Sequence, residues 1–135
     1  MIKTVISIII VFSISVALIF YYFANGLAEG LCSNEIYKEY PSPNQSLKAV
    51  VFQRECGPSS GATTQVSVIN AAKNLENRAG NVLVIKGHPK TVAPKLEWNS
   101  EQEMIIYHQI DGSEFKAETR LELDKLVKIE YKNEN

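Results

Sequence analysis

The first 24 residues limit the fold of this chain more than any other feature. Residues 2–24 contain one charged side chain, Lys3, and the apolar run within them is interrupted only by serines. As an α-helix this segment would be about 34 Å long, slightly more than the hydrocarbon core of a bilayer. Tyr21 and Tyr22 stand at its C-terminal end, where aromatic side chains suit a membrane–water interface. We therefore expect an uncleaved transmembrane anchor over residues 1–25.

The charges that flank this segment predict its orientation. Lys3 precedes the segment and Glu29 follows it, and the positive-inside tendency then places the N-terminus in the cytoplasm. The rest of the chain would lie outside the cytoplasm. A cleaved signal peptide is the alternative, because Gly26-Leu27-Ala28 has the small-x-small pattern of a cleavage site. The apolar run is longer than the roughly 7–15 residues usual for a signal peptide, which favours the anchor.

The chain beyond the anchor is long enough for one domain. About 104 residues follow from Cys32 onward, enough for one hydrophobic core and too few for two. The whole chain has 14 basic and 15 acidic residues and a net charge of −1. The basic residues are scattered singly, so the sequence lacks the positive patch of a nucleic-acid-binding protein. We expect neither a nucleic-acid partner nor a cofactor.

Cys32 and Cys56 are the two cysteines of the chain. An even number of cysteines in an exported domain favours a disulfide between them. The closed loop of about 25 residues would stabilise the fold by roughly 3 kcal/mol. Two separate buried thiols are the alternative if the domain is cytoplasmic. We expect no metal site, because His88 and His108 are far from the cysteines and the spacing does not suit metal ligands.

Residues 47–135 have the patterns of β-strands. Some segments are short apolar runs bounded by turn residues, and others alternate between apolar and polar residues. We expect an all-β domain, mainly an antiparallel sheet or a small sandwich of about six to seven strands. Residues 26–46 are expected to form a juxtamembrane linker and turn. The first candidate strands are residues 47–54, 65–71 and 82–86, followed by a hairpin of residues 95–98 and 104–108.

Residues 115–131 alternate most regularly. Odd positions are mostly apolar and even positions mostly charged, as expected when one sheet face is buried and the other is wet. One strand of this length would be unusually long, so we expect a hairpin that turns at Lys125. A short helix over residues 120–128 is the alternative. The hairpin would pair Leu123 with Val127, Leu121 with Ile129, Glu122 with Lys128, Arg120 with Glu130 and Glu118 with Lys132.

Residues 57–64 form a loop rich in small side chains. Gly57-Pro58-Ser59-Ser60-Gly61 matches the G-x-S-x-G pattern of hydrolases, in which a strand turns into a helix beneath the serine. Residues 65–71 predict a strand here instead, so we expect no catalytic residue. The exposed N–H groups of such a loop suit an anion or a partner's main chain, although a flexible connection is the alternative. The candidate interaction residues are Arg54, Gly57, Ser59, Ser60, Gly61, Thr63 and Thr64.

Part of the sequence resembles a group of small bacterial membrane-anchored proteins of uncharacterised function. The resemblance is carried by Ser42-Pro43, by the run KAVVFQRECG that begins at Lys48, and by TTQVSV from Thr63. The core of that group is similar to S-P-D-G … KAVVFxRDCGATT … TxVSI. This chain departs from it at Asn44-Gln45, where Asp-Gly is usual, and at Glu55, where Asp is usual. The resemblance implies the same architecture and location, and it implies no activity.

These patterns favour a protein that spans the bacterial inner membrane once. We expect it to bind a partner and not to be an enzyme. The expected partner is an envelope protein, and an immunity-type protein that neutralises a toxin delivered to the envelope is one version. Two other functions remain open. One is a small envelope hydrolase that uses residues 57–61, and the other is an accessory subunit of a membrane complex that acts through its helix.

Overall fold

The computed structural model describes residues 1–134, apart from the side chains of Asn25, Ala28 and Glu29. The chain forms two compact units, which divide between Cys32 and Ser33. The orientation and cleavage expectations that used Glu29 and Ala28 rest on side chains outside the described set.

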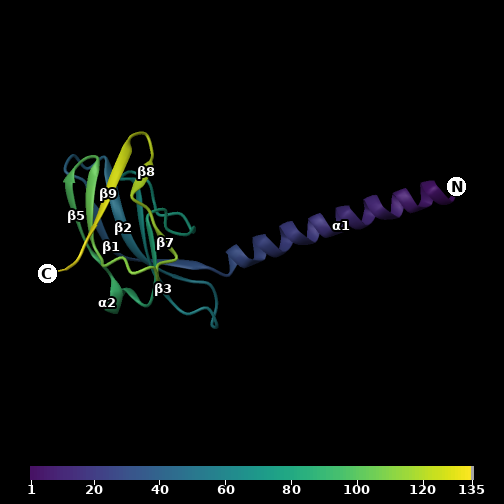
Figure 1. Ribbon diagram of the computed structural model, residues 1–135, viewed down its shortest axis with the longest axis horizontal. Helices are drawn as coiled ribbons and strands as arrows, with labels where there is room; N and C mark the ends of the chain where they lie inside the picture. Colours follow the sequence, from purple (N-terminus) through teal and green to yellow (C-terminus); the bar gives the residue numbers. More distant parts are fainter. Residues whose placement is uncertain (135) are drawn as a thin grey trace. The chain divides into compact units, whose positions relative to one another are not determined.

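The first unit is the helix α1, Ile2–Gly30 (Figure 1). Its segment Ile2–Ala24 is long and apolar enough to cross a membrane, a test that a signal sequence would also pass. Serine hydroxyls within it donate to carbonyl oxygens one turn earlier, Ser13 to Ile9 and Ser15 to Val11, each at 2.9 Å. These bonds let an isolated serine sit in an apolar helix without an unpaired hydroxyl.

The second unit is a β-sandwich of two sheets (Figure 1). A five-stranded sheet has the order β1-β2-β3-β4-β7, and a four-stranded sheet has the order β5-β6-β9-β8. Strands β6 and β9 pair in parallel, and the other pairs among the described residues are antiparallel. The elements are β1 Ser33–Pro41, β2 Leu47–Glu55, β3 Thr63–Asn70, β4 Leu83–Lys86, α2 Pro89–Val92, β5 Lys95–Ser100, β6 Glu103–Tyr107, β7 Lys116–Ala117, β8 Arg120–Glu122 and β9 Leu126–Lys132.

The hydrophobic core lies between the two sheets. Alternate residues of each strand point into it, because successive side chains of a strand face opposite sides of the sheet. Trp98 of β5 also donates its indole N–H to the main-chain oxygen of Tyr40 in β1, at 2.9 Å, and so ties the two sheets together. The core residues are Ala49, Val51, Val66, Val68, Val82, Leu83 and Ile85 on one side and Leu96, Met104, Ile106, Val127 and Ile129 on the other.

The expected fold class, one apolar helix followed by an all-β domain, is confirmed. The apolar run at 47–54 is β2, the alternating run at 65–71 lies in β3, and the run at 82–86 is β4. The hairpin of residues 95–108 is β5 and β6, with Leu96 opposite Ile106 and Trp98 opposite Met104.

The structure differs from the linker that we expected over residues 26–46. The helix continues to Gly30, and Ser33–Pro41 pairs with β2 as an edge strand. Seven of the nine residues of β1 are exposed, and the register shifts between Ile36 and Lys38. An exposed, bulged strand has no regular apolar alternation, so its sequence does not predict it.

The C-terminal hairpin is present, but its register differs from the expected one by two residues. Leu121 lies opposite Val127, and Arg120 lies opposite Lys128, so the expected charge pairs are not formed. A shift of two keeps the same residues on the buried face. Lys128 is instead aligned with Glu103 of the neighbouring strand β6. The register is therefore set by the core and by β6, because surface charge pairs contribute only tenths of a kcal/mol.

The residues that precede this hairpin, from Phe115 onward, also differ from the predicted single pair of strands. Residues Lys116–Ala117 form β7 in the other sheet, so the alternating run is divided between two sheets. Phe115 consequently lies at the surface, 67% exposed, although its position in the pattern predicted a buried face.

Candidate functional site

The five-stranded sheet has an outer face, turned away from the four-stranded sheet, that is also buried. Val50 and Phe52 of β2 are 0% exposed there, although they do not belong to the core between the sheets. The same face carries buried polar side chains, and buried polar groups need hydrogen-bond partners. Some of these partners come from residues 71–80, which we call the strap, and the others come from β1, from β3 and from Asn81. The buried polar residues of this face are Arg54, Gln65 and Ser67.

Arg54 and Asn34 hold the middle of the strap. The two residues lie opposite each other in β2 and β1. An Nη1–H group of Arg54 donates to Oδ1 of Asn34 at 2.7 Å and to Oδ1 of Asn77 at 3.0 Å. Nδ2 of Asn34 donates to the main-chain oxygens of Glu76 and Arg78, at 3.0 and 2.8 Å. The guanidinium of Arg54 is thus directed under the strap rather than towards the loop after β2.

Gly80 holds the end of the strap against the sheet. Its N–H donates to Oε1 of Gln65 at 2.6 Å, and its carbonyl oxygen accepts from Nζ of Lys116 at 3.1 Å. A Cβ atom at this position would lie 2.8 Å from the main-chain oxygen of Val66, closer than real Cβ contacts. Glycine therefore permits the close approach that anchors the strap.

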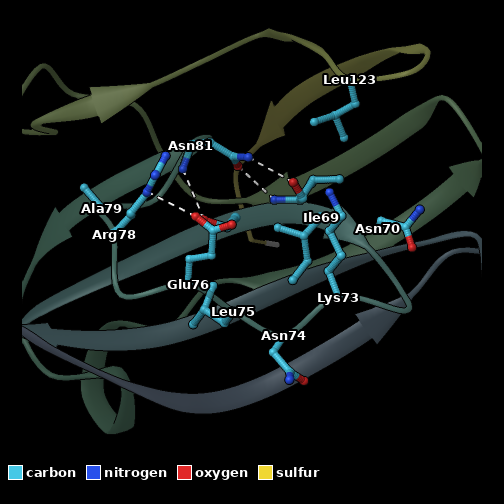
Figure 2. Close-up of a pocket in the computed structure, with 12 residues that line it drawn as sticks. Ile69, Asn70, Lys73, Asn74, Leu75, Glu76, Arg78, Ala79, Asn81 and Leu123 are labelled. Carbon is cyan, nitrogen blue, oxygen red and sulfur yellow. Dashed lines mark hydrogen bonds and ion pairs between the residues drawn. The ribbon is translucent and has the colours of Figure 1, made fainter.

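A cavity of about 310 Å³ lies between the strap, the end of β3 and the turn between β8 and β9 (Figure 2). Ile69 of β3, Leu75 of the strap and Leu123 of the turn line it. The first two side chains are half-buried, and Leu123 is 39% exposed. The end of β3, the strap that follows it and the distant turn between β8 and β9 thus contribute apolar side chains to one hollow.

Several polar groups in the wall of the cavity are already engaged. Oδ1 of Asn81 accepts from the N–H of Val68 and its Nδ2 donates to the carbonyl of Val68, both at 2.9 Å. The N–H of Asn81 donates to Oγ of Ser67 at 3.2 Å (Figure 2). Oδ1 of Asn70 accepts from the N–H of Ala72 at 2.9 Å. These bonds engage the side chain of Asn81 and the side-chain oxygen of Asn70, whereas Asn74, which also lines the cavity, is exposed.

The rim of the cavity carries three charged side chains of the strap. Nε of Arg78 lies 3.1 Å from Oε2 of Glu76, and both side chains are largely exposed (Figure 2). Lys73 is exposed as well, and it forms no ion pair within residues 1–134. The rim therefore has a net charge of +1, carried by Lys73.

The disulfide between Cys32 and Cys56 is present, as the sequence predicted. Cys32 directly precedes β1 and Cys56 directly follows β2, and the adjacent pair Ser33 and Glu55 begins the ladder between these strands. The bond therefore fixes the end of β1, one residue away from Asn34, which holds the strap.

The loop of residues 57–61 is a surface turn. Gly57 and Gly61 have φ angles of 109° and 69°, which favour glycine. Oγ of Ser60 donates to the carbonyl of Gly57 at 3.0 Å and accepts from the N–H of Cys56 at 3.2 Å. Ser59 is exposed. The chain then enters β3 rather than a helix, so this turn lacks the strand–turn–helix form of a nucleophile elbow.

Two further candidate residues are engaged inside the domain. Oγ1 of Thr63 donates to the carbonyl of Arg54 at 3.0 Å. Thr64 is 0% exposed, and its Oγ1 donates to the carbonyl of Gly87 at 2.9 Å. Of the candidate interaction residues, the loop positions 57–61 thus lie at the surface, whereas Arg54 and Thr64 do not.

The two histidines support local structure. Nδ1 of His88 accepts from the N–H of Lys90 at 3.1 Å and caps the short helix α2. Nε2 of His108 lies 2.9 Å from Oε1 of Glu114. A hydrogen bond from its own backbone N–H, aided by His108, lowers the pKa of the Glu114 carboxyl against the opposing effect of burial. Within residues 1–134 no three or more His, Cys, Asp or Glu side chains are grouped to hold a metal ion.

Comparison with known proteins gives no match to a family model, to a curated protein or to a solved structure.

Proposed function

We propose that this protein is a single-pass protein of the bacterial inner membrane whose β-sandwich lies outside the cytoplasm and binds an envelope protein, without catalysis. The disulfide that directly follows the apolar helix carries this proposal. Disulfides persist in oxidising compartments and are rare in the cytoplasm. The span Ile2–Ala24 has the length needed to hold the chain in a bilayer.

The form of the domain supports binding. The disulfide fixes one end of the five-stranded sheet, and hydrogen bonds fix the strap on its outer face. Surfaces that are already ordered lose little conformational entropy when a partner binds. The cavity of about 310 Å³ beneath the strap is such a surface, with walls from three segments.

The turn between β1 and β2 supports the resemblance to small bacterial membrane-anchored proteins. Gln45 has a φ angle of 61°, which is uncommon for residues other than glycine. That group has glycine at the corresponding position of its S-P-D-G pattern. Gln45 thus has the backbone conformation that glycine would adopt in the S-P-D-G turn. This supports a common turn in this chain and in that group, although the residue differs.

The location can be tested by labelling the two cysteines in intact cells. We expect a membrane-impermeant maleimide to label Cys32 and Cys56 only after an impermeant reductant has been added, in a membrane fraction that retains the full 15.1 kDa chain. A variant with Thr4→Cys in a background without the native cysteines is the control, and it should be labelled only after lysis. Labelling of the native cysteines without reductant, or only after lysis, would contradict the proposal.

The role of the domain can be separated from that of the helix by exchanging the anchor. We expect a chain whose residues 1–25 are replaced by an unrelated apolar helix of equal length to retain its crosslinked partner in native membranes. Loss of that partner would favour the accessory-subunit alternative, in which the helix itself binds. Ser59→Ala with Ser60→Ala tests the hydrolase alternative, because that alternative requires these serines and would lose its activity.

A further inference from the structure

We propose, building on the proposed function, that the cavity beneath the strap binds one large apolar side chain of the partner protein, flanked there by acidic residues. Protein interfaces concentrate their binding free energy in a few side chains that fill well-packed pockets. The volume of the cavity limits the size of this side chain, and the charged residues at the rim determine which neighbours it can have.

The volume of the cavity limits the size of its occupant. Pockets that enclose small ligands or cofactors measure about 300–1,000 Å³. This cavity, at about 310 Å³, lies at the lower end of that range. It therefore suits one side chain of the size of leucine or phenylalanine better than a cofactor.

The chemistry of the walls selects an apolar group. Ile69, Leu75 and Leu123 supply apolar surface from three segments, and burying that surface contributes about 25 cal/mol per Å². The polar atoms of Asn81 are already bonded to Val68 and Ser67. Beside Asn81, a polar occupant would lose its water without gaining equivalent hydrogen bonds, which disfavours it there.

The charge at the rim selects acidic neighbours. Glu76 and Arg78 balance each other, and Lys73 is left as an uncompensated cation. The adjoining turn carries Asp124 and Lys125, whose charges also cancel. A carboxylate beside the inserted side chain would therefore meet net positive charge, and opposite charges at an interface rim favour the correct partner.

A defined peptide can test this proposal on the full chain in phosphatidylcholine nanodiscs. The probe is an acetylated, amidated pentapeptide with leucine between two glutamates and serine at each end. Methyl NMR should show saturable shifts of Ile69, Leu75 and Leu123, with Val127 of the core unchanged. Peptides with lysine in place of the glutamates, or with serine in place of leucine, should bind at least about fivefold more weakly.

Matched variants locate the binding. Leu123→Asp should abolish the shifts, whereas Leu126→Asp should not, because Leu126 is exposed to a similar extent, 37% against 39%, and does not line the cavity. Lys73→Glu should weaken binding at least about fivefold, and Lys90→Glu in α2 should have no effect.

Three outcomes would overturn the proposal: no shift of the cavity methyls with the acidic leucine peptide, equal binding of the serine or lysine peptide, or equal effects of Leu123→Asp and Leu126→Asp. None of them bears on membrane location or partner binding, which are tested separately by cysteine labelling and anchor exchange. A partner that is lost after anchor exchange would contradict the proposed function even if the peptide binds.

Discussion

The two faces of the five-stranded sheet are both buried, but they are covered in different ways. The inner face packs against a second sheet through apolar side chains such as Val51 and Val66. The outer face is covered by the strap, which is held by hydrogen bonds that Arg54 donates and Gln65 accepts, among others. Apolar burial adds up over a large area, whereas one hydrogen bond contributes about 1 kcal/mol net. We infer that the inner face sets global stability and that the outer face opens locally at a lower free energy.

Removal of the disulfide should have the largest effect on this comparison. Cys32→Ser with Cys56→Ser should lower the free energy of unfolding by about 3 kcal/mol, because the unfolded chain gains the entropy of an open loop. Hydrogen exchange of the strap should rise more than that of β3, since Asn34 stands two residues after Cys32 and holds the strap. Equal increases in both segments would show that the disulfide does not act preferentially on the outer face.

Substitution of two neighbouring valines of β2 should have the next largest effect on stability, and it compares the two faces at closely matched positions. Val51→Ala on the inner face should lower the free energy of unfolding by about 2 kcal/mol, measured by urea denaturation. Val50→Ala on the outer face should cost about half as much, because the strap can settle into the space that the lost methyl groups leave. Both side chains are almost fully buried, at 1% and 0% exposed. A difference between the two losses of stability would therefore come from what covers each face, the second sheet or the strap, and not from the degree of burial.

Loss of the Arg54 guanidinium should free the strap with a smaller effect on the whole domain. Arg54→Met should increase the rate of tryptic cleavage after Lys73 and Arg78 by about tenfold, equivalent to about 1.4 kcal/mol of local opening. Lys48→Met is the control, because Lys48 lies on the same face of the same strand and pairs with Glu39 rather than with the strap. Faster cleavage in the control, or none in Arg54→Met, would show that other contacts hold the strap.

The inner face could be predicted from the sequence, because its residues are apolar at alternate positions. The runs around Val51, Val66 and Leu83 predicted the central strands, and the apolar segments around Trp98 and Ile106 predicted the β5–β6 hairpin. The register of β8 and β9 was wrong by two residues, because it relied on surface charge pairs. Those pairs contribute less than the core contacts of Leu121 and Val127.

The outer face and its cavity were not predicted, although the sequence contains a sign of them. Arg54 was predicted to end the strand of residues 47–54 and was grouped with the loop of residues 57–64 as a candidate interaction residue, because it stands beside that loop. The alternation of β2 places its side chain on the same face as Val50 and Phe52, away from the core. A buried arginine on that face, with Gln65 opposite Phe52 in β3, requires a polar covering segment. Which segment covers it depends on contacts between distant residues, and local patterns do not contain them.

The turn between β1 and β2 offers a change of small effect that should act on both faces alike. Gln45 adopts a φ angle of 61°, and its N–H donates to the carbonyl of Ser42 at 2.9 Å. Gln45→Gly should remove the strain of a side chain in this conformation and raise the free energy of unfolding by about 0.5 kcal/mol, after the larger entropy of the unfolded glycine chain is subtracted. Asn44→Gly is the control and should destabilise, because Oδ1 of Asn44 accepts from the N–H of Ser46 at 2.7 Å. Since the hairpin supports both faces, tryptic cleavage within the strap should slow no more than global unfolding does. A selective slowing in the strap would mean that the turn holds the outer face directly.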